Sequence, residues 1–189
     1  MRARAPARAS FAGQPAGFTM IELIVVLAVM ALALSFVVTR IDHLIPGEGL
    51  KASAREIAST IELARAGAAS QGRIRAIRYD LEAGSWRLFA PLLDEYGQEV
   101  PGPGPWGLHP AGPAQWLHEG VRFVAIQPMG LDLQRGGELA VRFDPLAIEG
   151  SHIVYLENRD GERFSIKYNA LTGLAEAVEG EAVFEGSEG

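Results

Sequence analysis

The sequence contains no cysteine among its 189 residues. This absence excludes disulfide bonds, thiolate metal sites and a thiol nucleophile. The histidines lack the close spacing of a zinc motif, and no calcium-loop pattern of acids lies near the carboxyl terminus. Ser151 and His152 stand next to each other, and we interpret both as surface or turn residues. We therefore expect no metal, no cofactor and no catalytic residue, and a structural rather than an enzymatic role.

Positive charge is scarce beyond the first residues of the chain. The formal net charge is −6, and residues 1–17 hold three arginines and no acid, so the remainder carries −9. Proteins that bind phosphate backbones use clustered Lys and Arg, which an acidic body does not favour. Arg73, Arg75 and Arg78 form only a small basic group, and we expect no nucleic-acid partner.

Residues 18–38 are apolar apart from one charged side chain, Glu22. At about 1.5 Å per residue, this run is long enough to cross a hydrocarbon core of roughly 30 Å. The arginines before it predict a cytoplasmic leader, because positive loops stay inside. A secretory signal peptide is the alternative, but its apolar region is usually about 7 to 15 residues and ends at a small-residue cleavage site. We predict a single-pass inner-membrane protein with its carboxyl-terminal domain in the periplasm.

A membrane anchor alone does not explain the charged side chain of Glu22. An ionised side chain costs about 2.5 to 3.5 kcal/mol at the centre of a membrane helix by insertion scales, and less near an end. If the chain is cut after Gly17, Glu22 lies near the first turn of a helix that begins at Phe18, where the helix dipole favours a carboxylate. It could then pair with the free amino group of its own chain or of a neighbour, which would set subunit register. An incidental acid near the membrane interface is the other interpretation.

The run GFTMIEL at residues 17–23, followed by apolar residues, resembles the class III signal of type IV pilins and of type II secretion pseudopilins. The resemblance implies that a prepilin peptidase cuts between Gly17 and Phe18 and methylates the new Phe18 amine. It also implies that Glu22 meets the amino terminus of a neighbouring subunit during assembly. Membrane lipid would surround the helix.

The body of the chain predicts an α+β fold. Apolar residues recur every three or four positions between Leu50 and Ala68, which indicates an amphipathic helix. Alternation from Ile77 to Leu81 then indicates a strand, and a turn sequence at residues 158–161 indicates a hairpin. Pro46 and Gly47 predict a break between the apolar run and this helix. Further strands are expected at residues 86–90, 121–126, 138–143, 151–157 and 162–169.

This order gives a pilin-like outline, with a long amino-terminal helix whose second half packs on an antiparallel sheet. We divide the chain into a leader at 1–17, a transmembrane helix at 18–40, a periplasmic domain at 41–178 and an acidic flexible tail at 179–189. Residues 94–113 are rich in Gly and Pro, and we expect a long exposed loop there.

Two stretches resemble the GspH/FimT branch of pilin-like proteins: ARAGAASQGRIRAIRYD at residues 64–80 and RFSIKYNALTGLAE at residues 163–176. The resemblance implies a minor pseudopilin near the tip of the periplasmic pseudopilus of type II secretion. Such a subunit would help initiate assembly and couple it to protein export. Its implied partners are the prepilin peptidase, the other major and minor pseudopilins and the inner-membrane assembly platform.

Two other functions stay open from the sequence. A FimT-like minor pilin of a type IV pilus would share the amino terminus and could assist pilus assembly or DNA uptake through basic residues. A monomeric receptor or adaptor on a single anchor would keep its leader and would not need Glu22. The acidic carboxyl-terminal third favours secretion over DNA binding.

Overall fold

The computed structural model describes residues 20–38, 48–146 and 148–184. It divides into two compact units, Met1–Leu44 and Ile45–Gly189. The predicted break at Pro46 and Gly47 lies outside the described residues.

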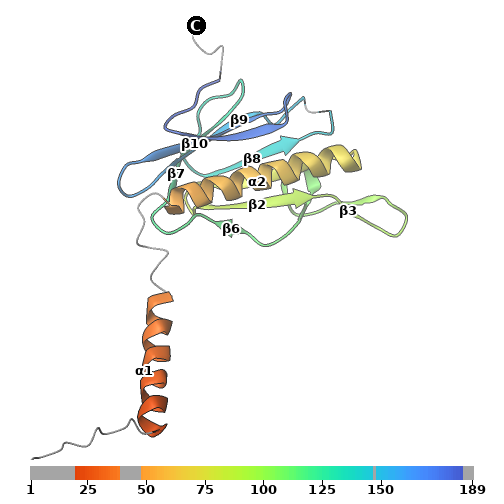
Figure 1. Cartoon of the computed structure of the whole chain (residues 1–189). Helices are drawn as coiled ribbons and strands as arrows, with labels where there is room; N and C mark the ends of the chain where they lie inside the picture. Colours follow the sequence, from red (N-terminus) through yellow and green to blue (C-terminus); the bar gives the residue numbers. More distant parts are fainter. Residues whose placement is uncertain (1–19, 39–47, 147, 185–189) are drawn as a thin grey trace, which may run out of the picture. The chain divides into compact units, whose positions relative to one another are not determined.

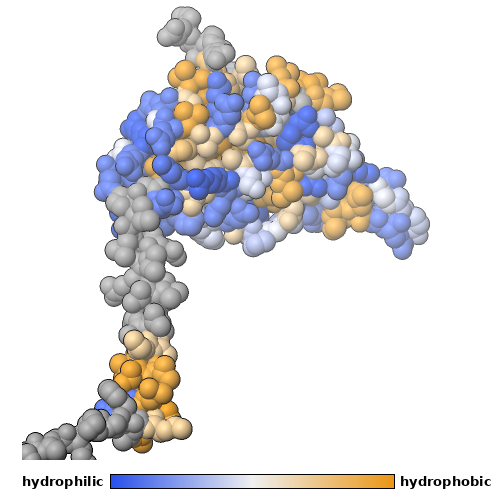
Figure 2. All heavy atoms as spheres, viewed as in Figure 1, coloured by the Kyte–Doolittle hydropathy of each residue, from blue (hydrophilic) through white to orange (hydrophobic). Residues whose placement is uncertain are grey.

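The first unit contains helix α1, Met20–Val38, 19 residues long (Figure 1). Large apolar side chains are exposed on consecutive positions, from Met20 at 84% to Leu32 at 66%, and Figure 2 shows the apolar colour of this helix. A helix that is hydrophobic on all sides is normally covered by other protein or by lipid.

Within the described part of the chain, no helix is both long and apolar enough to cross a membrane. The predicted transmembrane range 18–40 includes residues 18, 19, 39 and 40, which lie outside the described part.

The second unit consists of one long helix and two main antiparallel sheets (Figure 1). Helix α2, Glu48–Gln71, packs against strands of both sheets. The first sheet has the order β5-β2-β1-β8, with β6 also paired to β2, and the second has the order β11-β10-β9-β7. The bounds in the first sheet are β1 Arg75–Asp80, β2 Ser85–Ala90, β5 His109–Pro110, β6 Gln115–Trp116 and β8 Glu138–Phe143. Those in the second are β7 Arg122–Pro128, β9 His152–Glu157, β10 Arg163–Asn169 and β11 Leu174–Glu179. The predicted α+β class is confirmed.

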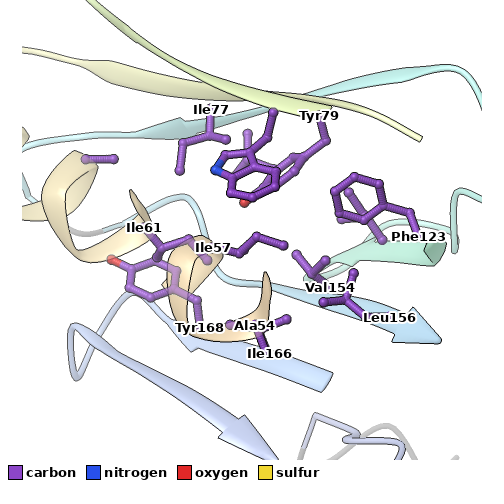
Figure 3. Close-up of a cluster of buried hydrophobic side chains, with 14 of the residues drawn as sticks. Ala54, Ile57, Ile61, Ile77, Tyr79, Phe123, Val154, Leu156, Ile166 and Tyr168 are labelled. Atoms are coloured by element: carbon purple, nitrogen blue, oxygen red, sulfur yellow. The ribbon is translucent and has the colours of Figure 1, made fainter. Parts of the chain in front are cut away.

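The core forms where the apolar stripe of α2 meets the inner faces of both sheets. The stripe residues predicted from the sequence are all buried: Leu50, Ala54, Ile57, Ile61, Ala64 and Ala68. Figure 3 shows Ile57 and Ile61 among side chains of both sheets, including Tyr79 of β1 and Ile166 of β10. Because each sheet buries its inner face against the same helix, the three elements share one core.

Thr60 introduces a hydroxyl into this core. The buried indole N–H of Trp86 donates a hydrogen bond to Thr60 Oγ1 at 3.1 Å. The Thr60 hydroxyl has one proton to donate, and the carbonyl oxygen of Glu56 at 2.8 Å and Oε1 of Gln115 at 3.1 Å both lie within reach. The largest fully buried side chain, Trp86, is therefore satisfied by a buried residue of α2 next to the stripe residue Ile61.

The hairpin predicted at residues 158–161 joins β9 and β10. Its turn is closed by a backbone hydrogen bond from Asn158 N–H to the Glu162 carbonyl at 3.0 Å. The Asn158 side chain accepts from the N–H groups of Asp160 and Glu162. Gly161 has φ of +82°, a conformation that glycine adopts without a side-chain clash.

The prediction of a long exposed loop at residues 94–113 is wrong in part. The short strands β3, Leu92–Leu93, and β4, Glu99–Val100, form a small ribbon, and the 3-10 turn η2, Pro105–Gly107, precedes β5, which pairs with β2. Leu108 is buried against Ala76 and Phe89 on the outer face of the first sheet. Gly104 lies so close to Phe89 that an added Cβ would come within 2.3 Å of the ring. The glycines there permit close packing as well as turning.

We predict that Ile61→Ala destabilises the second unit by about 2 to 5 kcal/mol, because it leaves a cavity in contact with both sheets. Leu63→Ala is the matched control, since Leu63 is on the same helix but is 58% exposed, and it should stay within about 0.5 kcal/mol of wild type. Urea unfolding of a fragment covering residues 41–189 measures both. Equal effects of the two substitutions would contradict the core assignment.

Candidate functional site

Three site residues are predicted in the amino-terminal motif, and the structure describes one of them. Glu22 lies in the first turn of α1 and its side chain is exposed among apolar neighbours. The backbone N–H groups of a first turn carry a partial positive charge, which favours a carboxylate at this position. Gly17 and Phe18, the predicted cleavage and methylation residues, lie outside the described residues.

Most arginines of the small basic group predicted from the sequence form ion pairs with acids of the same chain. Arg73 forms an ion pair with Glu99 at 2.6 Å, and Arg78 forms one with Glu138 at 3.6 Å. Arg75 lies over α2, where its Nε is buried. These side chains do not form a free basic surface of the kind that grips a phosphate backbone.

The expectation that Ser151 and His152 are surface or turn residues is wrong for His152. The His152 side chain is fully buried. Its Nδ1 lies 2.6 Å from the Gly150 carbonyl oxygen, and its Nε2 lies 3.0 Å from the Tyr79 hydroxyl. Nδ1–H therefore donates to Gly150 and the Tyr79 hydroxyl donates to Nε2, which requires a neutral imidazole. Neighbouring residues of a strand face opposite ways, so the sequence already indicated that one of this pair faces inward.

Burial sets the protonation of this pair. Desolvation lowers the pKa of His152 to about 4, although the hydrogen bond to Gly150 opposes this. Burial also raises the pKa of Tyr79. Both groups are therefore uncharged at neutral pH, and their hydrogen bond ties β1 of the first sheet to β9 of the second.

The predicted acidic tail at 179–189 begins inside β11 and stays bonded to the second sheet beyond it. The Ser165 hydroxyl donates to the Gly180 carbonyl at 2.5 Å and accepts from Ala182 N–H at 3.1 Å. The Tyr155 hydroxyl donates to the Ala182 carbonyl at 2.8 Å. Residues 185–189 lie outside the described part.

A carboxylate on the second sheet is held by two arginines. Glu157 contacts Arg163 at 2.9 Å and Arg122 at 2.5 Å. The hydrogen bond from Arg163, followed by that from Arg122, lowers the pKa of Glu157. In the ranges that the structure describes, no three His, Asp or Glu side chains gather as a metal site requires.

Comparison with known families identifies the amino-terminal motif. Residues 14–38 match the family model described as the prokaryotic N-terminal methylation motif. The match includes Gly17, Phe18 and Glu22, and it confirms the prediction that the chain carries the methylation motif of type IV pilins. None of the curated proteins matches the chain significantly.

Two solved structures of the minor pseudopilin EpsH, from the type II secretion system of Vibrio cholerae, are similar to this chain. One has a TM-score of 0.47 and 13% identity, and covers 69% of this chain and 98% of its own. The other has a TM-score of 0.49 and 14% identity, and covers 72% of this chain and 98% of its own. The likeness is distant, and the fold class follows from the topology of the chain itself.

We predict that the stability of the second unit falls by about 2 kcal/mol between pH 7 and pH 5 because of His152. The unfolded chain binds a proton at His152 near pH 6.5, whereas the folded chain binds it only near pH 4. The stabilisation is therefore present above pH 6.5 and is lost as the pH falls toward 4.

Urea unfolding of residues 41–189 at both pH values measures this change. His152→Asn should flatten the slope, because no group that titrates in this window remains at the site. His118→Asn is the control, since His118 is on the surface beside Glu56, and it should retain the wild-type slope. A wild-type slope in His152→Asn would contradict the assignment.

Proposed function

We propose that this chain is the precursor of a type IV pilin-like protein that is cut after Gly17 and methylated at Phe18. The observation that carries the proposal is the match of residues 14–38 to the N-terminal methylation motif. A prepilin peptidase is then the enzyme that acts on the chain, and the chain itself is a structural subunit with no reaction of its own.

The mature subunit is proposed to stay in the inner membrane through residues 18–40, with its carboxyl-terminal domain in the periplasm. The apolar run at residues 18–38 and the three arginines of the leader support this orientation. The apolar exposure of α1 supports it further, because such a helix needs an apolar surrounding.

Glu22 is proposed to guide assembly. After cleavage, Phe18 bears a positive amine, and the carboxylate of Glu22 lies one turn from the helix start, where a neighbouring subunit can present the same amine. In lipid, a pair of opposite charges costs less than either charge alone. Pairing therefore favours one register between adjacent helices.

Among pilin-like roles, we propose a minor pseudopilin of type II secretion, near the tip of the periplasmic pseudopilus, that helps initiate assembly and couples it to protein export. Its proposed partners are other pseudopilins and the inner-membrane assembly platform. The alternative, a FimT-like minor pilin with a role in DNA uptake, needs a free basic surface. The ion pairs of Arg73 and Arg78 argue against one in this region, as does the net charge of −6.

We predict that the mature protein from native membranes begins at N-methylated Phe18. Intact mass and amino-terminal sequence establish this directly. Gly17→Val should leave the full-length precursor, because a bulky side chain blocks the cleavage position. Gly13→Val makes the same change within the leader and should be processed normally. Processing of Gly17→Val at the wild-type rate, or a mature protein that starts at Met1, would contradict the proposal.

We predict that Glu22→Ala and Glu22→Gln are cleaved and methylated but do not assemble with other subunits. The amide tests charge rather than shape. Cross-linking of membrane-embedded subunits measures assembly, and mass spectrometry of the same samples confirms cleavage. Wild-type incorporation of Glu22→Gln would show that charge pairing is not required.

Loss of protein export, or of surface pili, in a deletion strain separates secretion from the pilus alternative.

A further inference from the structure

Strand β8 is an edge of the first sheet, and the phase of its ladder shows which backbone groups are free. Leu81 N–H donates to the Gly137 carbonyl at 3.0 Å, in the same register as the β1–β8 pairs. Residues of an antiparallel strand bond alternately to either side. The N–H and C=O groups of Glu138, Ala140 and Arg142 therefore point away from β1.

Ala140 lies at the centre of this outward-facing edge. The Gln134 side chain covers the Glu138 carbonyl, donating to it at 3.1 Å, and Gly150 lies against the Arg142 carbonyl, where an added Cβ would come within 2.7 Å. No described residue bonds to the outward N–H or C=O of Ala140. An unpaired edge of this kind is a template for another strand.

The outward edge of β8 opens into an apolar groove of about 340 Å³. Residues of the segments 128–131 and 148–151 line it together, and Met129 N–H donates to the Ser151 carbonyl at 2.9 Å. Several of its apolar side chains are solvent-exposed, with Met129 at 62%, Leu131 at 66% and Ile148 at 73%. Its apolar lining includes Trp106, Met129, Leu131, Leu139 and Ile148.

One side of the groove is held in place by Asp144. Its carboxylate accepts backbone N–H groups of Leu146 at 2.8 Å, Ile148 at 2.9 Å and Glu149 at 2.7 Å. The Asp144 residue is only 8% exposed, so its carboxylate lies mostly out of water. The bond from Ile148 N–H holds the backbone at this residue, which lowers the entropy cost of binding there.

The groove offers a ligand little unpaired charge. Its two charged lining residues pair with each other, Arg142 Nε lying 2.8 Å from Glu149 Oε2. Ser151 Oγ accepts from Ala170 N–H at 2.9 Å. A complementary ligand therefore has free backbone N–H and C=O groups, apolar side chains and no charge.

We propose that this groove, named here the β8 groove, binds an extended, uncharged, apolar segment of another protein, which adds a strand to β8. Main-chain hydrogen bonds to Ala140 supply part of the affinity, and alternate side chains of the segment enter the groove. Because the Glu138 and Arg142 carbonyls are covered, the free stretch of the edge is short, and a short single segment fits beside it more readily than the sheet of a second copy. This proposal is independent of the filament role.

The test uses the full-length chain in detergent micelles and a defined probe, a capped decapeptide of alternating valine and serine with a fluorescent label. Fluorescence anisotropy measures binding, and hydrogen exchange measures protection of the Ala140 amide. We expect saturable binding with protection centred on Ala140. The same peptide N-methylated at alternate residues should not bind, because it cannot form a ladder.

Ala140→Pro removes the outward N–H while sparing the bonds of β8 to β1, and proline is tolerated on edge strands. It should weaken binding about tenfold. Ala177→Pro is the matched control, because Ala177 lies on β11 at the edge of the other sheet, and Gly180 N–H to the Arg163 carbonyl shows that its N–H also points outward. It should bind like wild type. Ile148→Ser changes an exposed side chain and tests the groove without touching the strand.

Equal binding by wild type, Ala140→Pro and Ile148→Ser would overturn the proposal, and so would the absence of saturable binding to wild type. Protection of Ala140 that grows with protein concentration without peptide would also overturn it, because a second copy would then occupy the edge. Weakened binding in Ala140→Pro and Ile148→Ser, with Ala177→Pro unchanged, supports it.

Discussion

The second unit, Ile45–Gly189, depends on the burial of one helical face between two sheets. Ile57 and Ile61 of α2 are fully buried, and strands of both sheets contact the helix. Removing the apolar face of α2 would expose the inner faces of both sheets at once. The positions of β1, β8 and β10 therefore depend on α2, and so does the free edge that β8 presents at the far side of the first sheet.

Buried hydrogen bonds fix how the helix and the two sheets pack together, which apolar burial alone does not specify. The hydrogen bond between Tyr79 and His152 joins the two sheets, and the bond between Trp86 and Thr60 joins the first sheet to the helix. A buried polar group without a partner costs about 1 to 3 kcal/mol, so an arrangement that separated these pairs would be disfavoured. The same pairing makes the core sensitive to acid, because His152 must stay neutral to accept the hydrogen bond from the Tyr79 hydroxyl.

The sequence predicted the elements that carry a regular pattern. The stripe of α2 and the alternation in β1 are periodic, and β8 was predicted with its observed bounds. Strand β11 was missed because most of its side chains are exposed and it is held by backbone pairing to β10, which leaves no apolar alternation. Leu108 was missed because its partners come from β1 and β2, far away in the sequence.

The candidate sites divide in the same way. The methylation motif is a contiguous run in which residue type and order carry the information, so the sequence alone predicted it and the family comparison confirmed it. The β8 groove depends on which side of β8 bonds to β1, on the backbone bonds that Asp144 accepts and on residues brought together from four separate segments. Apart from the bonds to Asp144, these relations are not local. A short motif can therefore predict processing from the sequence alone, whereas a candidate binding surface is defined only by the folded sheet.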